Sequence, residues 1–106
     1  MGGRDVSSDV GAFMLYMVVE RFRGRDAAAV YGRFRERGRM MPDGLEFVGS
    51  WVETNCDRCF QLMESPDPSL LEQWAASWAD LVEFEFVPVV PGKEMAARFD
   101  PAAGAR

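Results

Sequence analysis

The sequence contains no histidine and only two cysteines among its 106 residues. Without histidine the chain has no Ser-His or Cys-His nucleophile pair and no imidazole ligand for a metal ion. It also has no side chain that titrates near neutral pH unless the protein shifts its pKa by a large amount. Sites that depend on imidazole chemistry are therefore excluded.

The two cysteines, Cys56 and Cys59, stand in a C-x-x-C spacing within "SWVETNCDRCFQLMES" (50–65). A structural zinc site needs four ligands, so two copies of the chain would have to share one. A redox pair belongs at a helix N-terminus, whereas Cys56 falls in a predicted turn and Cys59 in a predicted strand. We therefore expect a small buried Cys59, a half-exposed Cys56, no metal site and no cofactor.

The sequence also lacks a long apolar run. The longest, 12–19, is far shorter than the ~20 residues that cross a bilayer, and charged residues flank it. No positively charged segment followed by an apolar one opens the chain, and two neighbouring cysteines cannot cross-link a secreted mini-domain. We expect a cytoplasmic protein that does not contact a membrane.

Positive charge is missing from residues 59–92, and the chain as a whole carries a formal net charge of −5. That half is not expected to bind a polyanion such as a nucleic acid. The arginines of the first half form either a solvated helix face or a site for an anion or for the acidic segment of a second subunit. These arginines are Arg21, Arg23, Arg25, Arg33, Arg35, Arg37 and Arg39.

What is present is enough for one packed domain, because 48% of the residues are hydrophobic and 27% are charged. Residues 1–11 are small and polar and predict a disordered lead-in. Residues 12–90 predict a single α+β domain. Residues 91–106 predict a tail with one short helical turn, around Glu94 to Phe99, that docks on a partner.

The first half of the domain predicts a strand and a helix. "FMLYMVVERF" (13–22) is apolar on both faces, as in a central strand. After it, Asp26 can cap a helix, and Gly38 can end it. The helix would bury a stripe of apolar residues at Ala27, Val30 and Phe34.

The second half predicts a hairpin, a helix and an edge strand. Runs 45–54 and 58–65 are strand-like and are separated by a short turn around "NCD". Asp67-Pro68 predicts a helix start. The alternating run 82–90, which contains a proline, suits an edge strand. The helix between them would bury Leu71, Trp74, Trp78 and Leu81.

This order is β-α-β-β-α-β, the ferredoxin-like sandwich with a four-stranded antiparallel sheet, and it places the first and third strands at the centre. Two helices can cover only one face of such a sheet, yet the central strands are apolar on both faces. A second copy of the chain, sheet against sheet, would cover the other face; a bound ligand or a nucleic acid is the alternative.

Several segments, in order and without gaps, resemble the bacterial domain-of-unknown-function family numbered 3303. The resemblance implies a dimeric α+β barrel, in which two ferredoxin-like sheets close on each other, and it implies no activity. Other proteins of this architecture include cofactor-free monooxygenases, muconolactone isomerases and small ligand-binding proteins, an analogy of fold alone. The resembling segments are "MLYMVVERF" (14–22), "RFRERGRMMPDGL" (33–45), "SWV" (50–52), "RCFQLME" (58–64) and "WADLVEFEFVPV" (78–89).

RNA-recognition motifs use the same element order, but their third strand carries stacking aromatics. Here "RCFQLMES" (58–65) keeps Arg58 and Phe60 and lacks the glycine and the other aromatics of that motif. Together with the acidic net charge, this argues against RNA as a partner.

A pocket in the barrel is the remaining candidate site. If Glu53 pairs with Arg58 across the turn, Ser50 faces Gln61 on one side of the sheet. Trp51 then faces Phe60 on the opposite side. A slip of one residue would reverse this assignment. Polar side chains in otherwise apolar strands are typical of an apolar pocket with a few orienting groups, although each also fits a strand end or the core. The candidate ligand-binding residues are Tyr16, Glu20, Ser50, Trp51, Gln61 and Glu64.

Two functions follow as hypotheses. The first is a dimeric barrel that binds a small, mostly apolar molecule or acts as an interaction module. The second is a cofactor-independent monooxygenase or isomerase. In it, Glu20 or Glu64, with its pKa raised by burial, acts as the base, and Tyr16 or Gln61 orients a substrate oxygen.

Overall fold

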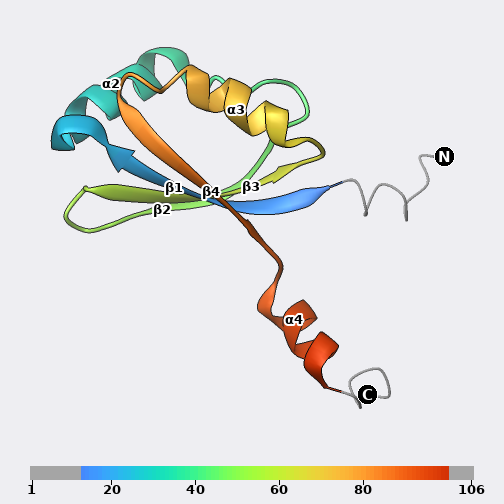
Figure 1. The fold of residues 1–106 in the computed structure, drawn as a ribbon. Helices are drawn as coiled ribbons and strands as arrows, with labels where there is room; N and C mark the ends of the chain where they lie inside the picture. The colour runs from blue at the N-terminus through green and yellow to red at the C-terminus, as the bar shows by residue number, and fades with distance from the viewer. Residues whose placement is uncertain (1–12, 101–106) are drawn as a thin grey trace.

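The computed structural model describes residues 13–100, which form a four-stranded sheet, a short 3₁₀ turn and three helices (Figure 1). Residues 1–11, for which the sequence predicts a disordered lead-in, lie outside this range. The elements are β1 (Met14–Phe22), η1 (Arg23–Arg25), α2 (Ala27–Arg37), β2 (Glu46–Val52), β3 (Arg58–Ser65), α3 (Pro68–Ala76), β4 (Val82–Val89) and α4 (Gly92–Phe99).

The strand order is β2-β3-β1-β4, and every neighbouring pair is antiparallel. The prediction of a ferredoxin-like α+β sandwich with the first and third strands at the centre is confirmed. Helices α2 and α3 lie on the same side of the sheet (Figure 1). We call this side the covered face and the opposite side the open face.

The predicted helix signals operate as expected. The Asp26 carboxylate accepts a hydrogen bond from the backbone N–H of Ala29 at 3.0 Å, and α2 ends at Gly38, whose φ of 68° suits glycine. The Asp67 carboxylate accepts from the backbone N–H of Ser69 at 2.9 Å, and Pro68 is the first residue of α3. Local chemistry therefore sets where both helices start.

The β2–β3 hairpin has the predicted register. Arg58 forms two hydrogen bonds with the Glu53 carboxylate, at 2.9 and 2.8 Å. Ser50 is opposite Gln61, and Trp51 is opposite Phe60. The polar pair and the aromatic pair therefore occupy opposite faces of the sheet. A β-bulge between Phe47 and Gly49 interrupts the pairing farther along β2.

The hydrophobic core lies between the covered face and α3. Leu71 and Trp74 of α3 are each 1% exposed, and Trp78, just beyond the helix, is also buried. On the sheet side the same face of β1 and β3 is buried, since side chains alternate along a strand. The residues buried there are Tyr16, Val18, Glu20, Phe22, Cys59, Gln61, Met63 and Ser65.

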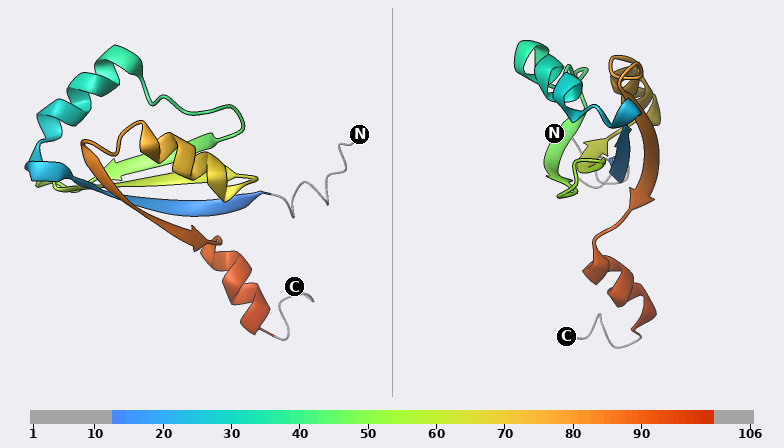
Figure 2. Two further views of the ribbon diagram at one scale, coloured as in Figure 1. Left: turned by 45° about the horizontal axis from the view of Figure 1, so that its top comes forward. Right: turned by 90° about the vertical axis from the view of Figure 1, so that its left-hand side faces the viewer.

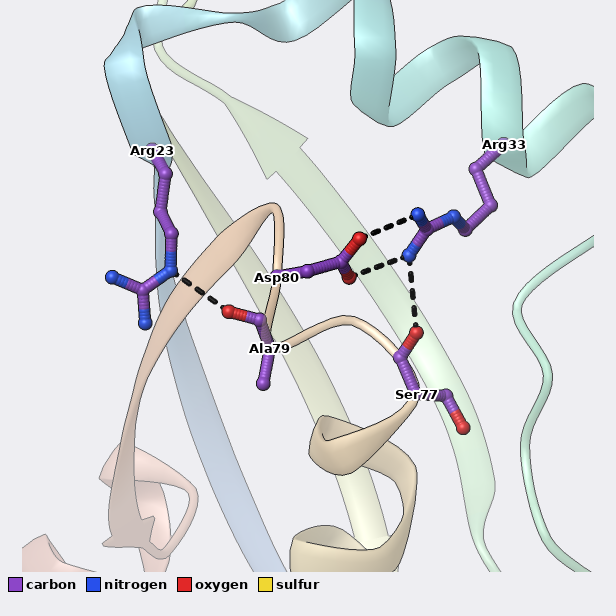
Figure 3. A network of polar contacts seen from close by, with 5 residues as sticks. All are labelled: Arg23, Arg33, Ser77, Ala79 and Asp80. Carbon is purple, nitrogen blue, oxygen red and sulfur yellow. Dashed lines mark hydrogen bonds and ion pairs between the residues drawn. The ribbon is translucent and has the colours of Figure 1, made fainter.

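Helix α2 is attached mainly at its edge. Val30 is its only buried residue. Arg33 of α2 donates two hydrogen bonds of 2.7 Å to the Asp80 carboxylate and one of 3.3 Å to the backbone oxygen of Ser77, both in the turn between α3 and β4 (Figure 3). Arg23 donates to the Ala79 backbone oxygen of the same turn, so this turn joins α2 to the end of β1.

No helix of residues 13–100 lies over the open face. Helix α4 extends from the end of β4 on the side of the sheet opposite α2 and α3, away from the body of the domain (Figures 1 and 2). Its residue Phe99 is 81% exposed, and Met95, four positions earlier on the same side of the helix, is exposed as well. Among the described residues, no helix has the length and apolarity needed to cross a bilayer.

Candidate functional site

A cavity of about 90 Å³ lies on the covered face, beneath α2. Its exposed lining residues belong to α2 and β2, so the cavity opens to solvent between these two elements. A water molecule occupies roughly 30 Å³, and an engineered cavity of about 150 Å³ binds benzene. This space therefore suits a short apolar group, or part of a longer molecule that extends through the opening. The walls comprise Glu20, Phe22, Val30, Tyr31, Phe34, Arg39, Ser50, Val52, Cys59, Gln61, Trp74 and Trp78.

Three polar side chains form a hydrogen-bonded network at the cavity. Arg39 Nε donates to Gln61 Oε1 at 3.3 Å, and Gln61 Nε2 donates in turn to Glu20 Oε2. The amide thus offers its acceptor to the cation and its donor to the carboxylate, which fixes its orientation at both ends. A buried carboxylate, an amide and a guanidinium are thereby linked within an apolar cavity.

The backbone of Arg39 is fixed by two tryptophans. The indole N–H groups of Trp74 and Trp78 each donate to the Arg39 backbone oxygen at 2.9 Å. The sequence predicted both tryptophans as core residues, and both are buried. They also hold the loop after α2 in place, so the Arg39 side chain starts from a fixed point at the cavity wall.

Glu20 projects from central strand β1 onto the covered face and is only 5% exposed. Burial raises its pKa from 4.5 to about 7, because the charged form loses hydration; the hydrogen bond from Gln61 and the positive charge of Arg39 reduce this rise. No side chain of residues 13–100 donates to its other oxygen, Oε1, and in the same range no side-chain oxygen is both fully buried and without a hydrogen bond. Glu20 Oε1 is therefore accessible from the cavity that Glu20 lines.

The two cysteines behave differently from each other. Cys59 is buried beside Glu20, and burial raises the pKa of its thiol to about 12, so the thiol stays protonated. Cys56 is exposed in the hairpin turn with a positive φ of 63°. In the range 13–100, no group of three or more acidic or cysteine side chains is placed to hold a metal ion.

Four of the six candidate residues lie on the covered face and two on the open face. Glu20, Ser50 and Gln61 line the cavity together. Tyr16 is buried on the same face but is not part of the cavity wall, and its hydroxyl donates to Met14 Sδ at 3.5 Å.

The remaining two candidates, Trp51 and Glu64, lie on the open face, across the sheet from the cavity. Trp51 is 58% exposed. It lies over Gly49, where a Cβ would come within 3.1 Å of the indole ring. Glu64 is exposed near one end of β3.

Arg39 and Tyr31 were not among the six pocket candidates, although Arg39 was one of the arginines for which an anion site was an alternative. Arg39 belongs to a loop, and only the folded chain shows that its side chain reaches Gln61. A signal did exist, because Gly38 ends α2 and Pro-Asp-Gly begins a turn at Pro42, so the loop between them is short. Tyr31 follows Val30 along α2 and faces the cavity with its partly exposed ring.

The arrangement offers a hydrogen-bond acceptor, a cation and an apolar wall within one small space. Such a combination can orient a small molecule by one polar group while its apolar body displaces water. It also places a carboxyl group that is half ionised near neutral pH where it could accept a proton from a bound molecule.

Comparison with known proteins gives a family but no activity. A family profile described as "Domain of unknown function (DUF3303)" matches residues 14–103. Searches of curated proteins and of solved structures gave no match. The match covers most of the chain, so this protein belongs to the DUF3303 family.

Proposed function

We propose that the chain is a small binding protein that holds a mostly apolar molecule in the cavity beneath α2. The observation that carries this proposal is the Glu20–Gln61–Arg39 hydrogen-bond network in an otherwise apolar wall. Burying a polar network of this kind costs desolvation energy, and apolar residues of similar size would stabilise the fold without that cost. A bacterial, cytoplasmic location is part of the same proposal.

We also propose that the protein is a homodimer, joined through the open face as a dimeric α+β barrel. The centre of that face is apolar, with Met17, Val19 and Leu62 side by side on neighbouring strands. Contiguous apolar surface of this kind marks an interaction site. An interaction module that uses the face for a different protein is the alternative.

The ends of the open face support a particular arrangement of the dimer. At one end Glu46 is directly opposite Glu64, and at the other Arg21 is directly opposite Arg58. Like charges in such positions destabilise a sheet. At the second end this repulsion is already offset, because Arg58 is paired with Glu53 and Arg21 also lies opposite Glu83 of β4. A two-fold axis that runs across the strands would place the Glu46–Glu64 end of one sheet over the Arg21–Arg58 end of the other, and this would relieve the repulsion between the two carboxylates.

Helix α4 supports the same dimer. It has eight residues, too few for a stable isolated helix in water, and its apolar side at Met95 and Phe99 has no cover from the described chain. Because α4 projects on the side of the open face, a second copy placed there would lie next to it (Figure 2).

A second candidate function is a cofactor-independent isomerase or monooxygenase with Glu20 as the base. The observation that favours it is the pKa of about 7, which suits proton transfer at neutral pH. It predicts that Glu20→Gln abolishes turnover while a bound molecule is retained. Exchange of α-protons of small ketones with deuterated water, followed by NMR, would measure this activity.

The binding proposal is tested by filling the cavity. Val30 lines it and is buried, so Val30→Phe should occupy the space, whereas Val48→Phe adds the same bulk at an exposed position of β2. Native mass spectrometry of protein purified without chelator should show a dimer with retained small-molecule mass. That mass should disappear in Val30→Phe and persist in Val48→Phe; equal retention in both variants would contradict the proposal.

A further inference from the structure

The guanidinium at the cavity wall has unused donors. Arg39 makes one side-chain hydrogen bond, through Nε, and forms no ion pair with any carboxylate of residues 13–100. Within this range, the N–H groups of Nη1 and Nη2 have no partner. A guanidinium presents its donors as a rigid planar fork that matches the two oxygens of a carboxylate. The fork is thus available to a molecule in the cavity.

Two aromatic rings hold this guanidinium. The Cζ atom of Arg39 lies 3.7 Å from the ring centroid of Phe47 and 5.2 Å from that of Phe34. Stacking on aromatic faces stabilises the cation without using its N–H donors, which point outward from the edge of the plane. An anion that approaches in this plane would meet a cation already held in position.

Few other groups around the cavity carry charge. From β3, Cys59 faces Glu20 with a protonated thiol, and from α2, Tyr31 faces it with a neutral hydroxyl, since burial raises the pKa of both. Strand β4 contributes Phe84 opposite Glu20, and α3 contributes an indole. When Glu20 is protonated, Arg39 is therefore the single charge among the described residues that line the cavity.

We propose that the cavity takes a small monocarboxylate, with its two oxygens on the Nη1 and Nη2 donors of Arg39 and its short apolar body against Phe22 and Trp74. This inference rests on the proposed binding function and specifies its ligand class. The volume of about 90 Å³ fits a chain of a few carbons. A larger acid would project through the opening between α2 and β2.

Protonation of Glu20 is coupled to this binding. A bound carboxylate repels the charged form of Glu20, so binding raises the pKa of Glu20 further and takes up a proton. Below about pH 7 most of Glu20 is already neutral and the anion binds without that cost. Affinity should therefore fall as the pH rises through 7, and a neutral ligand should not show this dependence.

The test compares butyrate with butyramide, which has nearly the same shape and no charge. Titration of the full chain, followed by the indole N–H resonances of Trp74 and Trp78, should show butyrate binding at least about tenfold more tightly at pH 6. Butyrate affinity should fall by about tenfold between pH 6 and pH 8. Glu20→Gln should remove this pH dependence.

Two arginine variants sharpen the test. Arg39→Gln should reduce butyrate binding to the level of butyramide, because it removes the fork and keeps the backbone oxygen that binds the indoles. Arg37→Gln, at an exposed position in the last turn of α2, removes the same charge and should leave binding unchanged. If Arg39→Gln fails to fold, the comparison of acid and amide on the native chain decides alone.

The outcomes separate the two proposals. If butyrate and butyramide bind equally, the carboxylate inference is wrong and the binding function stands. If butyrate, butyramide and the neutral probe cyclopentanol all leave the indole resonances unchanged up to their solubility, the binding function and the carboxylate inference are both wrong. Loss of butyrate binding in Arg37→Gln to the same extent as in Arg39→Gln would also overturn the inference, since net charge would then explain it.

Discussion

The two faces of one sheet contrast in this protein. The covered face buries Glu20 and Gln61, two of the most polar side chains in its strands, and the open face exposes Trp51, one of the largest apolar ones. In a monomeric protein the opposite distribution would be expected. This contrast supports the two proposals made above: a small molecule in the cavity of the covered face and a second copy of the chain on the open face.

The largest expected effect tests whether the covered face carries the stability of the domain. Trp74→Ala removes a side chain that is 1% exposed, and should lower the free energy of unfolding by about 3–5 kcal/mol. Trp51→Ala removes the same side chain from the open face, where it is largely exposed in the monomer, and should cost less than half as much at a protein concentration below the Kd of the proposed dimer. Chemical denaturation at one fixed protein concentration measures both; similar losses would remove the distinction between the faces.

A smaller effect concerns the buried carboxylate. The pKa of Glu20 rises from 4.5 to about 7 on folding, so between these values the folded state binds more protons than the unfolded state. Stability should therefore fall as the pH rises from about 4.5 to about 7, by at most roughly 3 kcal/mol, and then level off. Glu20→Gln should be more stable than the native chain at pH 8 and similar to it at pH 4.5.

The control for this prediction is Glu72→Gln on the exposed side of α3, which removes an equal charge without a buried site. Its stability should follow that of the native chain at both pH values. Urea denaturation curves across the pH range provide the measurement. If the Glu20→Gln and Glu72→Gln profiles coincide, Glu20 does not titrate as its burial predicts.

The open face is tested by adding charge to it. Phe60→Glu places a carboxylate near the centre of the proposed dimer interface and should raise the Kd of the dimer at least about a hundredfold, or about 2.7 kcal/mol. Gln73→Glu adds the same charge on the exposed side of α3 and should leave the dimer intact. Sedimentation velocity distinguishes them, and a native chain that is monomeric at all concentrations would contradict the proposed assembly.

The smallest effect concerns the attachment of α2 over the cavity. Arg33→Ala removes the paired hydrogen bonds to Asp80, which are solvent-exposed and therefore contribute little to global stability. We expect faster amide hydrogen exchange in α2 and no change in α3. Arg35→Ala is the control, since no ion pair of Arg35 occurs in the described chain. Equal exchange in the two variants would show that the Arg33–Asp80 contact does not hold α2.

The fold was predictable because its signals are local. Asp26, Gly38 and Asp67 act within one turn of their own positions, and the register of the hairpin follows from a pair only five residues apart, Glu53 and Arg58. Alternation of apolar residues then fixed which strand positions share a face. These features depend on neighbours in the sequence, so the sequence was sufficient.

The site was only partly predictable because its parts meet through tertiary contacts. The register put Ser50 and Gln61 on one face but did not show that Glu20 joins them there and Glu64 does not. The cavity lies between the sheet and the α2 residues Val30, Tyr31 and Phe34, and the sequence shows that these residues face it only once the helix has been placed. The reach of Arg39 depends on where two indoles hold its backbone, which no local pattern encodes.

The edges of the sheet limit how copies of this chain can assemble. The bulge between Phe47 and Gly49 disrupts the outer row of β2, and Pro88 removes a donor from β4, the other edge strand. Addition of strands from one molecule to the next, the route to open-ended fibres, is therefore disfavoured at both edges. In the proposed dimer, association through the open face with two-fold symmetry would end after two molecules, so the apolar centre of that face would carry no risk of unlimited growth.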